Sequence, residues 1–191
     1  SADLVCRLLD RVRRGTVLIA ASWLSRHRPQ IAAKLVELAR DRRIDVRVIV
    51  DSDIGDDGAG VAKHSTVDKA ALDALLQGGF PVRVAKVGIH HKLMLVDGEY
   101  GGVDQRIVFT GTPNLTVPAL KHNDEVLLEI KECETPPCSA AAATWVTPPT
   151  GSAPNNDLFQ RYEEQWVALC KRSKRYASNA PALEDCNLGT R

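Results

Sequence analysis

The first half of the chain alternates helical and strand-like apolar patterns. A helix is expected over residues 3–14, where leucines recur at helical spacing, and a continuous apolar strand follows over residues 16–21. The next helix is expected to begin at Pro29, and another buried strand covers residues 46–50. Buried strands that alternate with helices are typical of parallel sheets with right-handed crossovers. The order of these patterns therefore predicts an α/β fold.

The alternation continues as far as a strand over residues 82–87. Before it, Ser65 and Asp68 resemble a capping box for a helix over residues 66–77. After it, a strand that ends at an Asp97-Gly98 turn is followed by a loop and a second strand over residues 106–110. We therefore expect a mixed, largely parallel sheet with helices on both faces.

The strand-like stretch before Asp97 carries a histidine and a lysine two residues apart, His90 and Lys92. Side chains alternate along a strand, so both should point to the same face. A lysine in an otherwise apolar strand is costly to bury unless an anion meets it. The pair therefore predicts a site for an anionic group, whereas His91 should face the other side and be structural.

Further polar residues follow the next two expected strands. The sequence Gly111-Thr112-Pro113-Asn114 comes directly after residues 106–110, and Glu125 opens an apolar strand over residues 126–130. Together with His90 and Lys92, these residues supply an imidazole that can attack phosphorus, an ammonium and an amide that can hold phosphoryl oxygens, and a carboxylate that can orient the imidazole.

These pieces resemble the HKD signature of the phospholipase D superfamily, which reads His-x-Lys-x4-Asp followed by Gly-Ser-x-Asn. The matching residues occur here in the order His90-x-Lys92-x4-Asp97, Gly111-Thr112-x-Asn114 and Glu125. Two departures stand out, because Thr112 replaces the serine and the gap between Asp97 and Gly111 is longer than in the signature. Threonine keeps the hydroxyl, and the extra residues are interpreted as a longer hairpin loop, so neither departure removes a reacting group.

The resemblance implies a phosphodiesterase that works through a covalent phosphohistidine. His90 would attack phosphorus, Glu125 would hold its ring in the right tautomer, and Lys92 and Asn114 would stabilise the phosphoryl oxygens. Asp97 completes the signature, although its position suits a turn or a salt bridge better than chemistry.

Three further residues are expected to contact the substrate. Gly111 and Thr112 follow a strand end, where backbone N–H groups and side chains could line an anion site. Trp23 follows a strand at the edge where open α/β sheets bind ligands, although core packing explains it equally well.

No cofactor and no metal are expected. The acidic stretch over residues 51–58 fails the EF-hand test, because position twelve counted from Asp53 is His64 and not glutamate. We interpret this stretch as a mobile loop.

Members of this superfamily build their site from two signatures, and this chain has one. Either two copies pair as a homodimer, or the chain is half of a longer protein with the other signature. The run from Gly111 to Glu125 is most similar to the C-terminal signature of secreted bacterial enzymes of this type.

The substrate is less constrained than the reaction. A formal net charge of +1 gives no general attraction for nucleic acid, which favours phospholipid head groups as the substrate. The alternative is a nuclease acting on DNA or RNA, because small one-signature members of the superfamily are homodimeric nucleases. A second alternative is a non-catalytic binding module on the same fold.

The five cysteines favour a secreted protein. Two local disulfides, Cys133–Cys138 and Cys170–Cys186, are the economical arrangement and leave Cys6 over. Five reduced thiols in a cytosolic protein are the alternative.

The chain is expected to form a single phospholipase D-like domain over residues 1–191. Residues 131–157 are rich in proline, alanine, threonine and serine and predict a loop insertion. A helix should follow from Asp157, with a C-terminal tail over residues 172–191. No apolar run approaches the roughly 20 residues of a membrane span.

Overall fold

A computed structural model describes eleven stretches of the chain, and every structural statement below concerns these residues. They are residues 2–22, 24, 29–55, 67–80, 82–86, 88–90, 92–111, 127–131, 158–176, 186 and 188.

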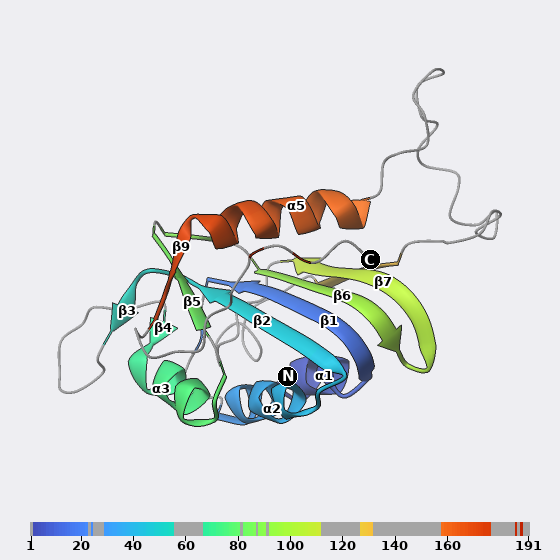
Figure 1. Ribbon diagram of the computed structural model, residues 1–191, viewed down its shortest axis with the longest axis horizontal. Coiled ribbons are helices and arrows are strands. Elements are labelled where there is room, and N and C mark those ends of the chain that lie inside the picture. The colour runs from blue at the N-terminus through green and yellow to red at the C-terminus, as the bar shows by residue number, and fades with distance from the viewer. Residues whose placement is uncertain are drawn as a thin grey trace, which may run out of the picture.

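A seven-stranded sheet forms the centre of the molecule, with the strand order β8-β7-β6-β1-β2-β5-β9 (Figure 1). Its strands are β1 (Val12–Ala21), β2 (Ile44–Val50), β5 (Val82–Ala85), β6 (Lys92–Tyr100), β7 (Val103–Gly111), β8 (Leu127–Lys131) and β9 (Ser173–Arg175). A separate pair of short strands consists of β3 (Ile54–Gly55) and β4 (Val67–Asp68). The fold is therefore α/β with a mixed sheet, as the sequence predicts.

Parallel pairing is confined to the three strands β1, β2 and β5, and their neighbours on both sides are antiparallel. Helices separate β1 from β2 and β2 from β5 along the chain, which is the connection that parallel strands need. From β6 onward the chain instead turns back on itself through a hairpin. The parallel part is thus smaller than the sequence patterns indicate.

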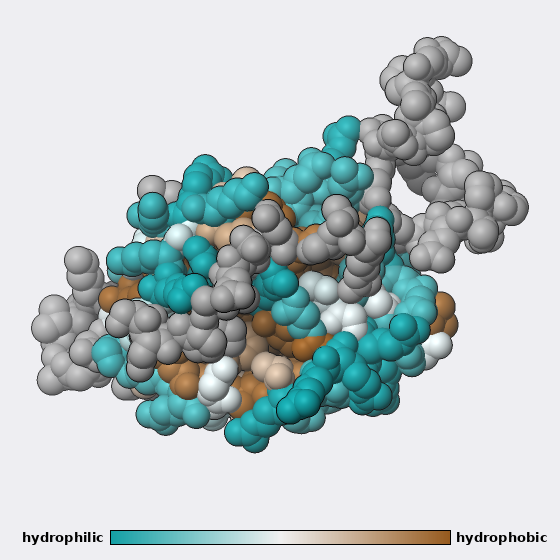
Figure 2. Space-filling model, in the orientation of Figure 1, coloured by the Kyte–Doolittle hydropathy of each residue, from teal (hydrophilic) through white to brown (hydrophobic). Residues whose placement is uncertain are grey.

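Helices cover both faces of the sheet. Figure 1 shows α1 (Ala2–Leu9), α2 (Pro29–Arg40) and α3 (Lys69–Gln77) below the sheet and α5 (Leu158–Lys171) above it. Alternate residues of β1 enter two separate apolar clusters, Val17 and Ile19 below and Leu18 and Ala20 above. The continuous apolar run in this strand therefore reflects burial on both faces. In the same orientation, Figure 2 shows hydrophilic residues over α5 and hydrophobic residues gathered near the middle of the visible face.

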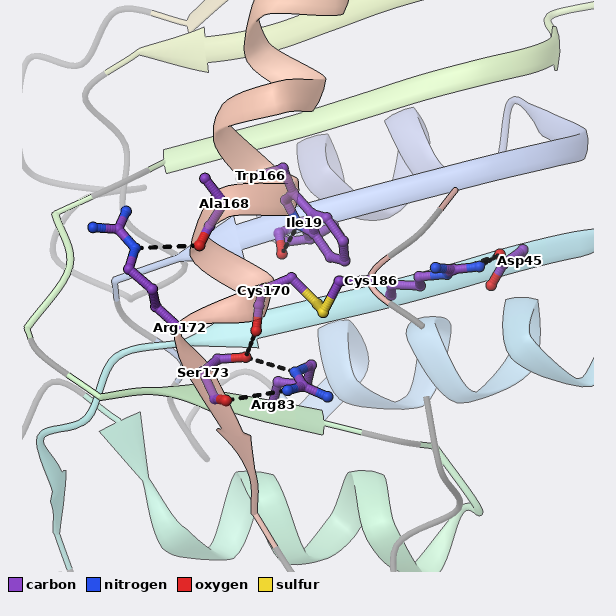
Figure 3. Close-up of a disulfide and its surroundings, with 10 residues drawn as sticks. Ile19, Asp45, Arg83, Trp166, Ala168, Cys170, Arg172, Ser173 and Cys186 are labelled. Atoms are coloured by element: carbon purple, nitrogen blue, oxygen red, sulfur yellow. Dashed lines mark hydrogen bonds and ion pairs between the residues drawn. A yellow bond between two sulfur atoms is a disulfide. The ribbon is translucent and has the colours of Figure 1, made fainter. Parts of the chain in front are cut away.

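Helix α5 is fixed to the sheet by its apolar face and by a hydrogen bond. Phe159, Trp166 and Leu169 are buried, and the indole Nε1 of Trp166 donates to the carbonyl oxygen of Ile19 in β1 at 3.1 Å (Figure 3). A hydrogen-bonded indole can be buried without leaving its N–H unsatisfied. The helix expected from Asp157 is thus present from Leu158 onward, and Trp166 contributes both a buried ring and a hydrogen bond to the sheet.

One of the two expected disulfides is confirmed. Cys170, in the last turn of α5, is bonded to Cys186, with 5.7 Å between the two Cα atoms (Figure 3). Cys6 is outside any disulfide, and its sulfur lies 3.8 Å from the carbonyl oxygen of Gln30. Cys133 and Cys138 lie outside the described residues.

Two element boundaries differ from the expected ones because of contacts between strands. The first helix ends at Leu9 rather than near residue 14, since Val12 already pairs with Tyr100 in the sheet. Asp97-Gly98 is not a turn, because β6 runs on to Tyr100 and the chain reverses at Gly101-Gly102.

The third helix begins later than expected. Asp68 is its N-cap, and its carboxylate accepts the N–H of Ala70 at 2.9 Å, so the helix starts at Lys69. Ser65, the other expected member of the capping box, lies outside the described residues. None of the helices in the described part of the chain is both long and apolar enough to cross a membrane.

Candidate active site

Several strand ends meet at one edge of the sheet. The parallel strands β1, β2 and β5 all end there, and β6 begins there because its first residue, Lys92, pairs with Ala21 at the end of β1. The end of β7 and the start of β8 reach the same edge, where Gly111 pairs with Leu127. In open α/β sheets, ligands bind outside the carboxyl ends of the parallel strands.

His90 and Lys92 lie together at this edge. The ammonium Nζ of Lys92 is 3.1 Å from Nε2 and 3.2 Å from Nδ1 of the His90 ring, and it donates to the His90 carbonyl oxygen at 3.3 Å. The His90 side chain is exposed, and Lys92 is half-buried. The structure therefore brings an imidazole ring and an ammonium group together at this edge of the sheet.

The pair is not held as a regular strand would hold it. Strand β6 begins at Lys92, so His90 precedes the strand instead of lying on it. Proximity comes from the lysine side chain reaching back along the chain to the imidazole. His91 lies outside the described residues.

The segment that carries His90 is attached to the end of the central strand β2. Asp51 directly follows Val50, is 5% exposed, and accepts the backbone N–H of Ile89 through Oδ2 at 3.2 Å. The sequence prediction of a mobile loop over residues 51–58 is therefore wrong for its first residue. The signal that could have identified Asp51 is its position, since it is the polar residue that directly follows the apolar run Val48-Ile49-Val50 at the end of β2.

The structure does not bring Asp97 together with His90 and Lys92. Asp97 lies five residues further along β6, about 17 Å away at strand spacing, and an odd separation sets its side chain on the opposite face from Lys92. Its carboxylate forms an ion pair with Arg106 of β7 at 3.9 Å. It lines a polar cleft of about 430 Å³ at the other edge of the sheet. The position thus fits the salt bridge rather than the chemistry.

Among the other expected site residues, Gly111 is described. It ends β7 with a φ of 155°, one residue beyond the pairing of Thr110 with Leu93. Thr112, Asn114, Glu125 and Trp23 lie outside the described residues. Gly111 ends β7 next to the start of β6, and Leu127, where the described part of the chain resumes, pairs with Gly111 on the other side of β7.

Exposed cations surround the same edge on the side of β5 and β9. Ala85, the last residue of β5, pairs with Ser173, so that Lys86 and Arg172 flank this pair, and both are exposed together with Lys171 and Lys174. Arg172 Nε donates to the carbonyl oxygen of Ala168 in the last turns of α5 (Figure 3). These residues were not singled out from the sequence, and Lys171, Arg172 and Lys174 are distant from the signature along the chain.

Arg83 fastens β9 to the sheet. Its guanidinium donates to the hydroxyl of Ser173 at 2.6 Å and to the carbonyl oxygen of Ser173 at 3.1 Å (Figure 3). Burial, and secondly the positive charge of Arg175, lowers the pKa of Arg83. Lys174 and Arg175, the basic residues of β9, are thereby held on a fixed strand.

Comparison with known proteins identifies the family and the fold. Residues 5–138 match the family described as cardiolipin synthase, PLD-like domain. No curated protein matches the chain. Among solved structures, NucT from Helicobacter pylori is similar with a TM-score of 0.51 and 15% sequence identity, over 91% of this chain and 89% of NucT. At that identity the likeness concerns the fold.

The family match covers more than two thirds of the chain and includes the His90–Lys92 pair and the residues that follow β7. The exposed imidazole and its lysine lie at the edge where the parallel strands end. The chain therefore belongs to the phospholipase D superfamily, as a PLD-like phosphodiesterase domain of the cardiolipin synthase family.

Proposed function

We propose that this protein cleaves phosphodiesters through a covalent phosphohistidine formed at His90. The observation that carries the proposal is the contact of Lys92 Nζ with the exposed His90 ring, at 3.1 Å from Nε2. An exposed imidazole can reach phosphorus, and an ammonium beside it can hold a phosphoryl oxygen as charge builds up in the transition state.

The proposed reaction has two steps. In the first, a ring nitrogen of His90 forms a bond to phosphorus while the bond from phosphorus to the leaving alcohol breaks, and an acidic group protonates the departing oxygen. In the second, water gives up a proton to that same group and attacks phosphorus, which breaks the bond to nitrogen and returns His90 to its starting state. Lys92 would stabilise the oxygens in both steps.

Asn114 and Glu125 complete the proposed site. Asn114 is three residues past Gly111, and Glu125 is two residues before Leu127. Gly111 is the last residue of β7, and Leu127 is the first residue of β8. Both ends lie at the edge that carries His90. We assign Asn114 to the phosphoryl oxygens and Glu125 to the orientation of the His90 ring, and Gly111 and Thr112 to substrate binding.

A phospholipid head group is the first proposed substrate class. Two observations support it. The description of the matching family names cardiolipin synthase. The Cys170–Cys186 disulfide is of a kind that persists in extracellular or periplasmic proteins. We accordingly infer an exported protein that acts outside the cytosol.

Nucleic acid is the second candidate, and a specific observation favours it. Lys86, Lys171, Arg172 and Lys174 form an exposed basic strip beside the His90 edge, although the net charge of the chain is only +1. A strip of lysine and arginine side chains follows a polyanionic backbone better than it fits a single head group.

One experiment tests the reaction and separates the two substrates. The purified protein is incubated with vesicles of phosphatidylcholine and phosphatidylglycerol, and separately with single-stranded and plasmid DNA, and the release of head group and of DNA ends is followed. Acid-labile phosphate or phosphatidyl groups trapped on His90 after rapid denaturation would support the mechanism. Cleavage that proceeds with no adduct on His90, or no cleavage of any of these substrates, would overturn it.

A further inference from the structure

We propose that Asp51 is the residue that positions His90, by fixing the backbone immediately before it to the end of the central strand β2. The kinetic part of this inference rests on the proposed function, whereas the anchoring itself does not. No part of the HKD signature includes Asp51.

The carboxylate of Asp51 joins two segments that are far apart in the sequence. Oδ2 accepts the N–H of Ile89, 38 residues away, at 3.2 Å. Oδ1 accepts the N–H of Asp53 at 3.1 Å and the hydroxyl of Ser52 at 3.3 Å. One oxygen therefore serves the segment that carries His90, and the other serves the residues that follow β2.

Burial makes the hydrogen bonds of Asp51 energetically necessary. Asp51 is 5% exposed, and within the described part of the chain it forms no ion pair. A buried carboxylate without a cation is costly unless hydrogen bonds satisfy its oxygens. The three donors to Asp51 supply that compensation, and they include the backbone N–H next to His90.

An amide in place of this carboxylate could not accept hydrogen bonds from both segments. Asparagine has one acceptor oxygen, and its NH₂ group would face a backbone N–H, donor against donor. The contact with Ile89 or the contact with Asp53 would have to break. The geometry thus needs two acceptor oxygens on one buried side chain, which explains the presence of aspartate at this position.

Ile89 is the connection between this anchor and the catalytic ring. Its side chain is 6% exposed within the apolar cluster beneath α5, and its N–H is bound by Asp51. Two independent contacts therefore fix the residue before His90, although His90 itself precedes strand β6. A misplacement of about 1 Å at a reacting group can cost on the order of 100-fold in rate.

The test compares Asp51→Asn with Asp68→Asn in the full-length protein. Asp68 is a matched control, because it is 7% exposed and also accepts a backbone N–H, that of Ala70 at 2.9 Å, but that bond caps α3 and does not touch the His90 segment. The measurements are hydrogen exchange of the Ile89 amide by NMR, the free energy of unfolding, and kcat and KM for the best substrate.

We expect Asp51→Asn to speed exchange of the Ile89 amide at least tenfold and to lower kcat at least tenfold, with KM changed less than threefold. Asp68→Asn should lose a similar amount of stability and keep its kcat within twofold. Equal losses of kcat in the two variants, or unchanged exchange at Ile89, would overturn the inference.

Failure of the proposed function is distinguishable from failure of this inference. If the wild-type protein cleaves none of the substrates, the proposed function fails, and the exchange of Ile89 still decides whether Asp51 anchors the segment. If Asp51→Asn does not fold, the wild-type protein gives the answer: an Ile89 amide that exchanges as fast as in an unstructured peptide would overturn the anchoring.

Discussion

Gly15 of β1 faces Gly98 of β6, with no side chain between the two strands. A Cβ atom on Gly15 would lie 2.2 Å from the carbonyl oxygen of Asp97, and one on Gly98 would lie 2.3 Å from the carbonyl oxygen of Arg14. Both residues also have φ values that other residues rarely adopt, 112° and 145°. This close approach lets β6 continue past the point where Asp97-Gly98 would otherwise turn the chain.

The first prediction is that Gly98→Ala lowers the free energy of unfolding by more than about 2 kcal/mol, because it combines backbone strain with a clash against backbone atoms. Gly102→Ala is the matched control, since Gly102 also has a positive φ, 89°, but has nothing within 4 Å of its Cβ position. Strain alone should cost about 1 kcal/mol there. Urea unfolding of both variants measures the difference. Equal losses of stability would contradict the close approach of Gly15 and Gly98 as the cause.

The second prediction separates the signature residues by position. His90→Ala should abolish phosphodiester cleavage, with a loss of several orders of magnitude in kcat, because it removes the proposed nucleophile. Asp97→Asn should keep most of the activity and lose less than about 1 kcal/mol of stability, since its ion pair with Arg106 is partly exposed. A folded His90→Ala variant with more than about a tenth of wild-type activity would rule out the nucleophile, and an inactive, folded Asp97→Asn variant would contradict the separation of Asp97 from the site.

The third prediction is that activity survives an excess of EDTA. In the proposed reaction, Lys92 and Asn114 stabilise the phosphoryl charge, so that a divalent ion has no assigned part. Initial rates with EDTA, and with added Mg²⁺ or Ca²⁺, measure this directly. Loss of turnover on chelation, followed by recovery with a divalent ion, would show that the mechanism is wrong and would direct attention to the acidic stretch over residues 51–58.

The fourth prediction concerns assembly. In-line displacement places the attacking nitrogen and the departing oxygen on opposite sides of phosphorus, so a single His90 cannot attack and also protonate the leaving group. If two copies of this chain supply the two histidines, specific activity should fall on dilution below the dimer dissociation constant. Heterodimers of wild type and His90→Ala should be inactive or stop after one half-reaction.

Sedimentation and activity measured on the same samples check this prediction. An active monomer would contradict the two-histidine account. An inactive monomer would instead indicate that the second signature belongs to another part of a longer protein.

The fifth prediction uses the buried phenol of Tyr100. Burial raises the pKa of Tyr100, and its hydroxyl has no hydrogen-bond partner in the described part of the chain. A pKa raised by folding contributes stability that is complete below the unfolded value near 10 and is lost as the pH rises through the folded value. Tyr100→Phe should therefore be at least as stable as the wild type at pH 7, and it should lose less stability than the wild type between pH 9 and 11. Thermal unfolding of both proteins from pH 9 to 11 measures this difference. Equal losses of stability in the two proteins would contradict the prediction.

Local sequence patterns were sufficient to predict the helices and strands that are buried on one or both faces. The buried strands β1 and β2 and the amphipathic face of α2 could be predicted because hydrophobic spacing is visible in consecutive residues. The Cys170–Cys186 disulfide could be predicted because the two cysteines are only 16 residues apart and bracket the C-terminal tail. The identities and order of His90 and Lys92 likewise indicate phosphoryl chemistry from the amino-acid sequence alone.

The amino-acid sequence by itself thus determined the α/β class, and it is the source of the reacting groups that we propose. Only the tertiary structure decided where β6 turns, which face Asp97 occupies and what holds His90 in place. These features depend on contacts between residues far apart in the chain, Gly15 with Gly98, Asp97 with Arg106 and Asp51 with Ile89, which no local spacing reveals. The physical reason is that strand pairing and buried hydrogen bonds satisfy backbone groups across the sheet, so their partners are fixed by the register of the whole sheet and not by neighbouring residues.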